Sequence, residues 1–525
     1  MDRRAVSGAG GSWKLAAPHA ARAQGLVVSG FGKLPTGRAL FLEFRWQDQA
    51  PGKGSWLGTL DAIAPVTDAS GRQERAVSLA FTHAGLARMG LPAAALDSFA
   101  APFREGMMQE DRLRRLGDRR EGEWLGTVIP DGPKWSANTP RRGAMQSAPD
   151  APVNELTATG HREERIVTEI TVHALLQLFE KDEDSAEAWA TAVEAALAPH
   201  GIAVVRKLPL DLRPDAKGID REHFGFADGV SQPIPFDETA IVGAAERDYW
   251  NGIPLGDVLL GHRDSHHEIA PSPSAPPLAP GAPDPELAPH PLAEGMLDFG
   301  LDGSYMVVRE LKQDVAAFWN SLDAAAERIR LRDPHHSAHV TADWIAERVI
   351  GRTRDGELLC PAGSLLPDAG NAFGFFDRDR HGYGCPVGSH VRRSNPRDGL
   401  APDAGSRDAL LEAANAHRFL RRGRKYGTTI ADRHVDDHAD RGLLFICLNT
   451  DIGRQFEFVQ QTWLLNSNFA TLYDEMDPLL GAKGHMTIRE KPLRRRIAVD
   501  TFVQMAGGDY FFLPSIPALR YLGSL

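Results

Sequence analysis

Three segments between positions 223 and 427 contain residues whose types and spacing could do chemistry. The first is a loop rich in glycine and proline that carries His390, and a neutral imidazole on such a loop can bind iron. Arg392, Arg393 and Arg397 follow closely, and their guanidinium groups suit the carboxylates of a cofactor. On composition alone, a solvated surface loop is an equally good interpretation of this segment.

The second segment places Asp228 among Phe224, Phe226 and Gly229, in a stretch with almost no charge. Such a carboxylate can lie on the wall of an apolar pocket, where its pKa would shift. An Asp-Gly pair is more often a turn, so the turn remains the commoner interpretation.

The third segment, residues 417–427, is cationic and has the pattern of a helix that stops at a glycine-containing turn. Segments of this kind are usually solvated or bind phosphate. A single arginine turned inward would provide a fixed cation in a pocket.

The elements that must position these residues follow from the apolar pattern. In the first 210 residues we expect strands at 26–32 and 39–46 around a turn at 35–37, a strand at 167–179 and a strand at 202–210. A helix is expected between the last two, because apolar residues recur at helical spacing from Trp189 to Leu197 and Gly201 can end it.

A second set of elements has the same pattern. We expect strands at 303–311, 442–449 and 507–515, and a helix through Val315, Phe318, Trp319 and Leu322. Residues 127–153 are predicted to be a loop, and the proline-rich residues 271–291 an extended, mobile insertion without ladder or helix. Two sets of strands and helices predict an α+β protein of two domains.

Composition excludes several classes of protein. Lys and Arg number 59 against 70 Asp and Glu, a net charge of −11, which argues against a nucleic-acid partner. Because no run of about 18 apolar residues occurs, no membrane span is expected. Residues 1–24 lack the apolar core of a signal peptide and are predicted to be a loose leader. Three cysteines without a C-x-x-C pair fit a reducing cytoplasm.

Taken in order, the motifs resemble the dye-decolorizing peroxidase family of haem enzymes, and its larger members in particular. The resemblance rests on G-x-x-D-G at 225–229, GSYMVVREL at 303–311, GSHVRRSNPR at 388–397, HRFLRRGRKYG at 417–427 and GGDYFFLPS at 507–515. It implies two ferredoxin-like domains with antiparallel sheets and flanking helices, at 25–212 and 213–525. The second domain would hold most of the haem and carry the proline-rich insertion at 262–296.

The resemblance also implies roles for individual residues. His390 would be the axial ligand of the iron of haem b, Asp228 the distal acid and base, and Arg421 the distal arginine beside the cofactor, with Arg422 as its nearest rival. Asp can accept and return the peroxide proton, and Arg can stabilise charge on the leaving oxygen.

For the substrates and the neighbouring residues of this site, the sequence allows several candidates. Hydrogen peroxide and small or bulky aromatic donors are the implied substrates, and a homo-oligomer remains open. Asp451 and Glu457 are candidates for the carboxylate that orients His390. Tyr426 is a candidate electron relay to bulky dyes, with Trp463 and Tyr510 as competitors and ordinary core packing as the simpler interpretation.

Two alternative functions belong to other classes of protein. A haem-binding or haem-handling protein on the same fold would use His390 without fast peroxide chemistry. A metal-dependent hydrolase could use His434 and His438, which stand four residues apart among aspartates. The histidines at 262, 266, 267 and 290 border the proline-rich insertion and are expected to be solvated.

Overall fold

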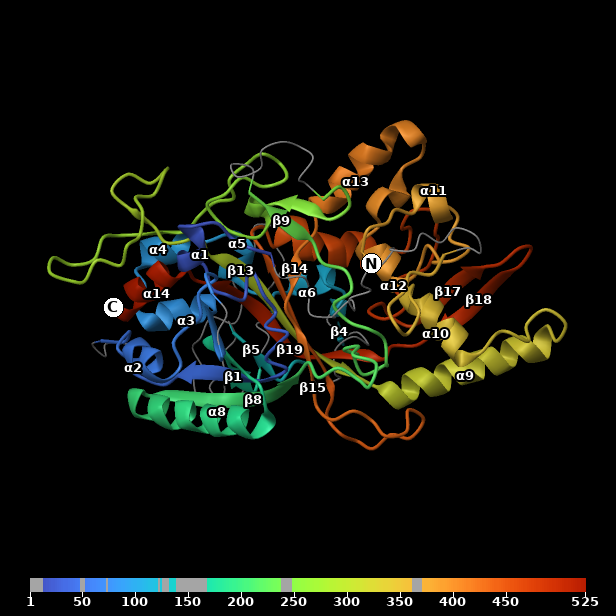
Figure 1. Cartoon of the computed structure of the whole chain (residues 1–525), viewed down its shortest axis with the longest axis horizontal. Coiled ribbons are helices and arrows are strands. Elements are labelled where there is room, and N and C mark those ends of the chain that lie inside the picture. Colours follow the sequence, from blue (N-terminus) through green and yellow to red (C-terminus); the bar gives the residue numbers. More distant parts are fainter. Residues whose placement is uncertain are drawn as a thin grey trace.

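The computed structural model describes residues 13–47, 52–71, 74–120, 123–124, 132–137, 168–237, 248–360 and 371–525. Its centre is a mixed, largely antiparallel 11-stranded sheet (Figure 1). The strands of the sheet are β1 (Thr36–Phe44), β2 (Ala76–Phe81), β5 (Trp135–Ser136), β6 (Ile170–Thr171), β7 (Ala174–Glu180), β8 (Ile202–Asp211), β13 (Ser304–Gln313), β14 (Leu420–Arg421), β15 (Arg424–Tyr426), β16 (Gly442–Asn449) and β19 (Val503–Leu513).

Helices and smaller strand pairs surround the sheet. The helices are α1 (His19–Arg22), α2 (Trp56–Ile63), α3 (His83–Met89), α4 (Ala93–Asp97), α5 (Ala101–Glu105), α6 (Glu110–Arg115), α8 (Glu183–Leu197), α9 (Val315–Arg332), α10 (Ala342–Ile350), α11 (Phe376–Asp379), α12 (His390–Ser394), α13 (Arg407–Asn415) and α14 (Ile516–Gly523). The small pairs join β3 (Arg119–Arg120) to β4 (Glu123–Trp124), β9 (Ile234–Phe236) to β10 (Gly252–Pro254), β11 (Ser274–Ala275) to β12 (Leu297–Asp298), and β17 (Gly484–Arg489) to β18 (Arg494–Val499).

The main strands of the sheet form two groups, one from each half of the chain. Strands from the first half of the chain lie in the order β8-β1-β7-β2, and those from the second half in the order β15-β16-β13-β19. Since β15 also pairs with β8 and β19 with β2, the hydrogen-bonded order closes on itself. The two halves therefore share one sheet.

Each face of the sheet has its own apolar core. One face of β1 packs through Leu40 and Leu42 against α2, α8 and α14, and the other packs through Ala39 and Phe41 against the N-terminal segment 15–34. In Figure 1, α2, α3, α4 and α14 gather at the left-hand end, and α9, α10 and the β17–β18 hairpin extend at the right. Within the described residues, no helix is both long and apolar enough to span a bilayer.

Several predicted elements are confirmed. The expected strands at 202–210, 303–311, 442–449 and 507–515 correspond to β8, β13, β16 and β19, and the two expected helices are α8 and α9. Gly201 follows α8 and a short helical turn with φ of 75°, the left-handed conformation that glycine adopts without strain. The expected strand at 167–179 is divided into β6 and β7, and Val167 lies outside the described residues.

Two expected elements are wrong for one shared reason. Residues 26–32 form turns and irregular backbone instead of a strand, and residues 417–427 contain β14 and β15 instead of a helix. Arg422 Nε donates to the Leu26 carbonyl at 2.6 Å, and Arg424 Nη2 donates to the Gly30 carbonyl at 2.7 Å. These arginines are buried and replace the ladder partners that a strand at 26–32 would have needed.

The predicted loose leader does not extend through residue 24. From residue 13 onward the segment is described, contains α1, and buries Leu15, Ala23 and Gln24. The Gln24 amide donates to the carbonyls of Leu79 and Pro514. Residues 1–12 of the predicted leader lie outside the described part of the chain.

The two predicted loops also contain strands. In the proline-rich insertion, Ser274 and Ala275 pair with Asp298 and Leu297, so the expectation of no ladder is wrong. The Tyr521 hydroxyl donates to the Pro276 carbonyl and ties the insertion to α14. Of the predicted loop 127–153, residues 132–137 are described, and they include β5 within the sheet.

Candidate active site

A largely apolar cavity of about 280 Å³ is formed by the part of the chain that follows β8. Its lining residues all fall between positions 222 and 503. They include residues of the loop before β9, of β13, β14, β16 and α12, and of the irregular helical segment after β16. Aromatic rings make up much of its wall: Phe224, Phe226, Phe373, Phe419, Phe445 and Phe456. An apolar cavity with a few polar groups is the usual form of a cofactor site.

His390 is the first residue of α12 and lines this cavity. Its Nδ1 lies 3.0 Å from Asp477 Oδ2, and the imidazole is 29% exposed while the carboxylate is fully buried. Burial raises the pKa of Asp477, but the charge and hydrogen bond of His390 more than offset this and lower it. The ionised Asp477 therefore accepts the proton of Nδ1, which leaves the lone pair of Nε2 free to bind a metal.

Asp477 is itself fixed by the backbone, because its Oδ1 accepts from the amides of Leu479 and Leu480 at 2.9 Å each. The sequence-based candidates for this role are wrong. Asp451 instead accepts from the Arg454 amide, and Glu457 accepts from the Tyr510 hydroxyl. No local motif marks Asp477, which lies 87 residues after His390 in the chain.

Asp228 and Arg421 line the same cavity and face each other. Asp228 Oδ1 lies 3.5 Å from Arg421 Nη1, and the two side chains are 29% and 37% exposed. The carboxylate also accepts from the Gly229 amide at 2.6 Å, and Arg421 Nη2 donates to the Ser231 carbonyl at 3.0 Å. Each group is thus held by the backbone while the contact between them stays loose and accessible.

The glycines of the G-x-x-D-G motif shape the loop that carries Asp228. Gly225 and Gly229 have φ of 96° and 68°, conformations that residues with a Cβ rarely adopt. A Cβ at Gly225 would also come within 2.5 Å of the Arg354 guanidinium. The loop therefore requires glycine at both ends.

The other arginines named from the sequence do not reach the cavity. Arg422, the rival of Arg421, points toward the N-terminal segment and donates to the carbonyls of Leu26 and Val27. Arg392, Arg393 and Arg397 do not line the cavity either, so their expected role toward cofactor carboxylates is wrong. They are buried and donate chiefly to backbone carbonyls: Asp379, Cys385, Trp463, Glu475 and Asn371.

Three buried arginines that the sequence did not single out do line the cavity: Arg309, Arg352 and Arg418. Arg309 Nη1 and Arg352 Nη2 have no hydrogen-bond partner within the described part of the chain. Burial lowers the pKa of Arg352 to about 10, which still leaves it charged at neutral pH. An unpaired buried guanidinium nitrogen needs an acceptor, so the cavity suits a ligand that carries carboxylates.

Two more carboxylates lie beside Asp228. Burial raises the pKa of Glu222 to about 7 and that of Asp220 to about 6, and the charge of Asp228 contributes to both shifts. Glu222 lines the cavity and accepts from the amides of Phe224 and Phe226 at 2.8 Å. It fixes the loop that leads to Asp228.

The aromatic candidates for electron transfer differ in their position. Tyr426 and Tyr510 are buried in the cores around the sheet and do not line the cavity. Trp463 lies edge-on to His417, with ring centroids 5.3 Å apart. His417 lines the cavity and stacks on Phe458 at 3.7 Å, a second cavity imidazole that the sequence did not single out.

The histidines of the hydrolase alternative do not converge. His438 is 87% exposed and pairs with Asp436, whereas His434 contacts Asn320 and Asp323. Neither belongs to a group of three potential metal ligands in the described residues. The expectation that His262 is solvated is also wrong, because its side chain is 15% exposed and bonds to Asp302.

The chain resembles known peroxidases in sequence. It is 31% identical over 422 residues to the multifunctional dye peroxidase DyP2 of Amycolatopsis sp. (strain ATCC 39116 / 75iv2), a match that covers 76% of this chain and 79% of that one. It is 28% identical to the dye-decolorizing peroxidase msp1 of Mycetinis scorodonius, over 61% of this chain and 60% of the relative. No protein-family model matches the chain.

Solved structures share its fold. A DyP-type peroxidase of Anabaena sp. superposes with a TM-score of 0.67 at 22% identity, covering 96% of this chain and 94% of that one. DyP2 from Amycolatopsis superposes with a TM-score of 0.64 at 23% identity, covering 98% and 99%. Given this fold and the extent of the match to the Amycolatopsis enzyme, the chain belongs to the dye-decolorizing peroxidase family.

Proposed function

We propose that this peroxidase binds haem b in the cavity through His390, and that Asp228 and Arg421 act on hydrogen peroxide. The observation that carries the proposal is one apolar cavity lined both by an imidazole whose Nε2 is free and by a carboxylate–guanidinium pair. Arg309 and Arg352 support the choice of haem, because their unpaired nitrogens would bind its carboxylates.

When bound, haem supplies the iron at which peroxide is reduced and through which organic donors are oxidised. The residues around it supply the proton chemistry. Asp228 takes a proton from one oxygen of peroxide and returns it to the other, which leaves as water. Arg421 stays charged throughout and stabilises the negative charge that builds on the leaving oxygen. Asp477 keeps the proton of His390 on Nδ1.

The order of the strands supports a finer description of the fold. Both halves follow the order 4-1-3-2 of a ferredoxin-like unit, β8-β1-β7-β2 in the first and β19-β13-β16-β15 in the second. We infer two such units joined edge to edge, the second of which provides the cavity. A cytoplasmic location is supported by Cys360, Cys385 and Cys447, which are all free.

Donors of the phenol and dye classes are proposed from the relatives. One structural neighbour is a dye-decolorizing peroxidase in complex with 2,6-dimethoxyphenol, and it superposes on this chain with a TM-score of 0.63. The partly exposed pair of Asp228 and Arg421 gives a small phenol access to the cavity.

A visible absorption spectrum of the purified protein tests the proposal. We expect an intense Soret band, a change in that band on adding an equivalent of peroxide, and its return on adding 2,6-dimethoxyphenol. Protein that binds no haem after reconstitution would contradict the proposal. A Soret band that does not respond to peroxide would favour the alternative of a haem-binding protein without peroxidase chemistry.

A further inference from the structure

We propose that His19, His262 and Asp302 form a binding site for a divalent transition metal ion, with Zn²⁺ as the favoured occupant. The site is separate from the cavity, since none of the three residues lines it. The potential ligand atoms, one from each residue, all lie within 4.8 Å of one another.

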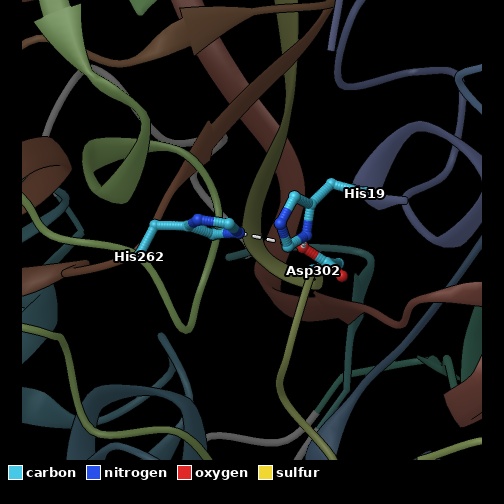
Figure 2. Close-up of side chains that lie close together, drawn as sticks. All are labelled: His19, His262 and Asp302. Carbon is cyan, nitrogen blue, oxygen red and sulfur yellow. Dashed lines mark hydrogen bonds and ion pairs between the residues drawn. The ribbon is translucent and has the colours of Figure 1, made fainter. Parts of the chain in front are cut away.

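The two imidazoles converge on one carboxylate oxygen (Figure 2). His19 Nδ1 lies 2.7 Å and His262 Nε2 2.9 Å from Asp302 Oδ1. The rings meet edge to face with centroids 4.6 Å apart, so both nitrogens face the same small volume. Ligands around a tetrahedral zinc ion lie roughly 3.3 Å apart, so the two nitrogen–oxygen distances need to lengthen by only about 0.5 Å.

The chemistry of the donors favours zinc over calcium or magnesium. Two neutral imidazoles and one carboxylate form the N/N/O set that zinc and its neighbours in the periodic table prefer. The Asp302 side chain is fully buried and lies within ion-pair distance of His19, His262 and Arg22, so its carboxylate is held in place beside the two imidazoles. Exposure of 28% at His19 and 15% at His262 leaves room for water as a fourth ligand.

The second oxygen of Asp302 already has a partner. Arg22 Nε donates to Oδ2 at 2.8 Å and so aims Oδ1 at the two imidazoles. Carboxylate ligands are commonly oriented in this way by a second hydrogen bond. The positive charge of Arg22 also weakens the electrostatic attraction of the site for any cation. This favours zinc, which imidazole nitrogens bind well, over calcium or magnesium, which bind mainly through charge.

The backbone holds the three ligands in place before a metal binds. The amide of Asp302 donates to the Leu260 carbonyl and the amide of Leu260 donates to the Gly303 carbonyl, which joins the segments of His262 and Asp302. The amide of Ala69 donates to the carbonyls of Ala20 and Ala23, which fixes the helix of His19. A metal would therefore cross-link the N-terminal segment, the start of the insertion and the entry to β13.

Zinc content of the tag-free holoenzyme tests the proposal. The protein is equilibrated with excess ZnCl₂, desalted and digested for elemental analysis, and its fold is checked by far-UV circular dichroism. We expect one zinc ion per chain in the wild type and most of it lost in both His19→Gln and His262→Gln. His266→Gln is the matched control, since His266 borders the same insertion but is exposed and outside the cluster. This control should keep its zinc.

Thermal melting gives a second readout. Because an ion that binds only the folded chain stabilises it, zinc should raise the melting temperature of the wild type and the control by a few degrees, and that of the two variants much less. Wild-type protein that emerges without zinc would overturn the proposal. Equal zinc content in the folded wild type, His19→Gln and His262→Gln would overturn it as well. Neither result depends on haem or on peroxidase activity.

Discussion

At the scale of single residues, Asp477 determines which nitrogen of His390 is free. A buried, ionised carboxylate that already accepts two amide hydrogen bonds holds the imidazole in one orientation and one tautomer. The motif around His390 could be recognised in the sequence, but Asp477 could not be identified as the partner of His390. Asp477 reaches His390 through the tertiary fold, and no spacing rule connects two residues 87 positions apart.

Replacing Asp477 with Asn should slow the reaction with peroxide by about 10- to 100-fold, because the imidazole loses its anionic partner. The rate of the Soret change in stopped flow measures the effect. Asp451→Asn is the matched control, since Asp451 is a partly exposed carboxylate that does not touch His390. Equal rates in the two variants would show that Asp477 has no influence on the site.

Asp228→Asn removes the carboxylate that we propose moves the peroxide proton, and we expect the same stopped-flow rate to fall by about 10²-fold or more. Arg421→Leu should also lower it, because the charge on the leaving oxygen loses its cation. Arg454→Leu is a suitable control, since the Arg454 side chain is half-exposed, pairs with Glu268 and does not line the cavity. Unchanged rates in both cavity variants would exclude the pair from peroxide activation.

Among the helices and strands, those with a clear apolar pattern were predicted correctly, whereas the segment rich in arginine was not. β8, β13, β16 and α9 follow from alternating or helical apolar residues, because burial of those residues dictates the element. In residues 417–427 the arginines suggested a solvated helix, yet Arg422 and Arg424 are buried donors to backbone carbonyls. Sequence pattern cannot reveal such pairing, since the acceptors lie almost 400 residues earlier.

Arg422→Leu should lower the free energy of unfolding by roughly 1–3 kcal/mol, because the Leu26 and Val27 carbonyls lose their donor. Urea denaturation, followed by far-UV circular dichroism, measures the change. The control is Arg213→Leu, because the Arg213 side chain is 58% exposed and pairs with Asp211 at the surface. A loss no larger than that of the control would mean that Arg422 does not stabilise the N-terminal segment.

At the scale of the whole molecule, the order of motifs along the chain predicted the family, and the fold agrees with it. The sequence did not show that the N-terminal segment from residue 13 packs beneath the sheet and supplies His19 to a cluster with His262 and Asp302. These contacts join distant parts of the chain, and the three polar residues of the cluster belong to no recognisable sequence motif. Only the closed fold brings them together.

The pH dependence of stability should report the buried carboxylates next to the site. The pKa of Glu222 is raised from 4.5 to about 7, so the folded chain keeps a proton that the unfolded chain releases between these values. The contribution of Glu222 to the free energy of unfolding is therefore greatest below pH 4.5 and decreases as the pH rises to about 7. Glu222→Gln should flatten this part of the urea-stability profile; an unchanged slope would contradict the shifted pKa.

Replacing His390 with glycine and then adding free imidazole tests whether His390 binds the haem iron. We expect His390→Gly to lose the wild-type ferric spectrum and most of its haem, and free imidazole to restore both. His417→Gln, which changes the other cavity histidine noted above, should keep the wild-type spectrum. A wild-type spectrum and haem content in His390→Gly without imidazole, or their loss in His417→Gln, would show that a residue other than His390 binds the iron.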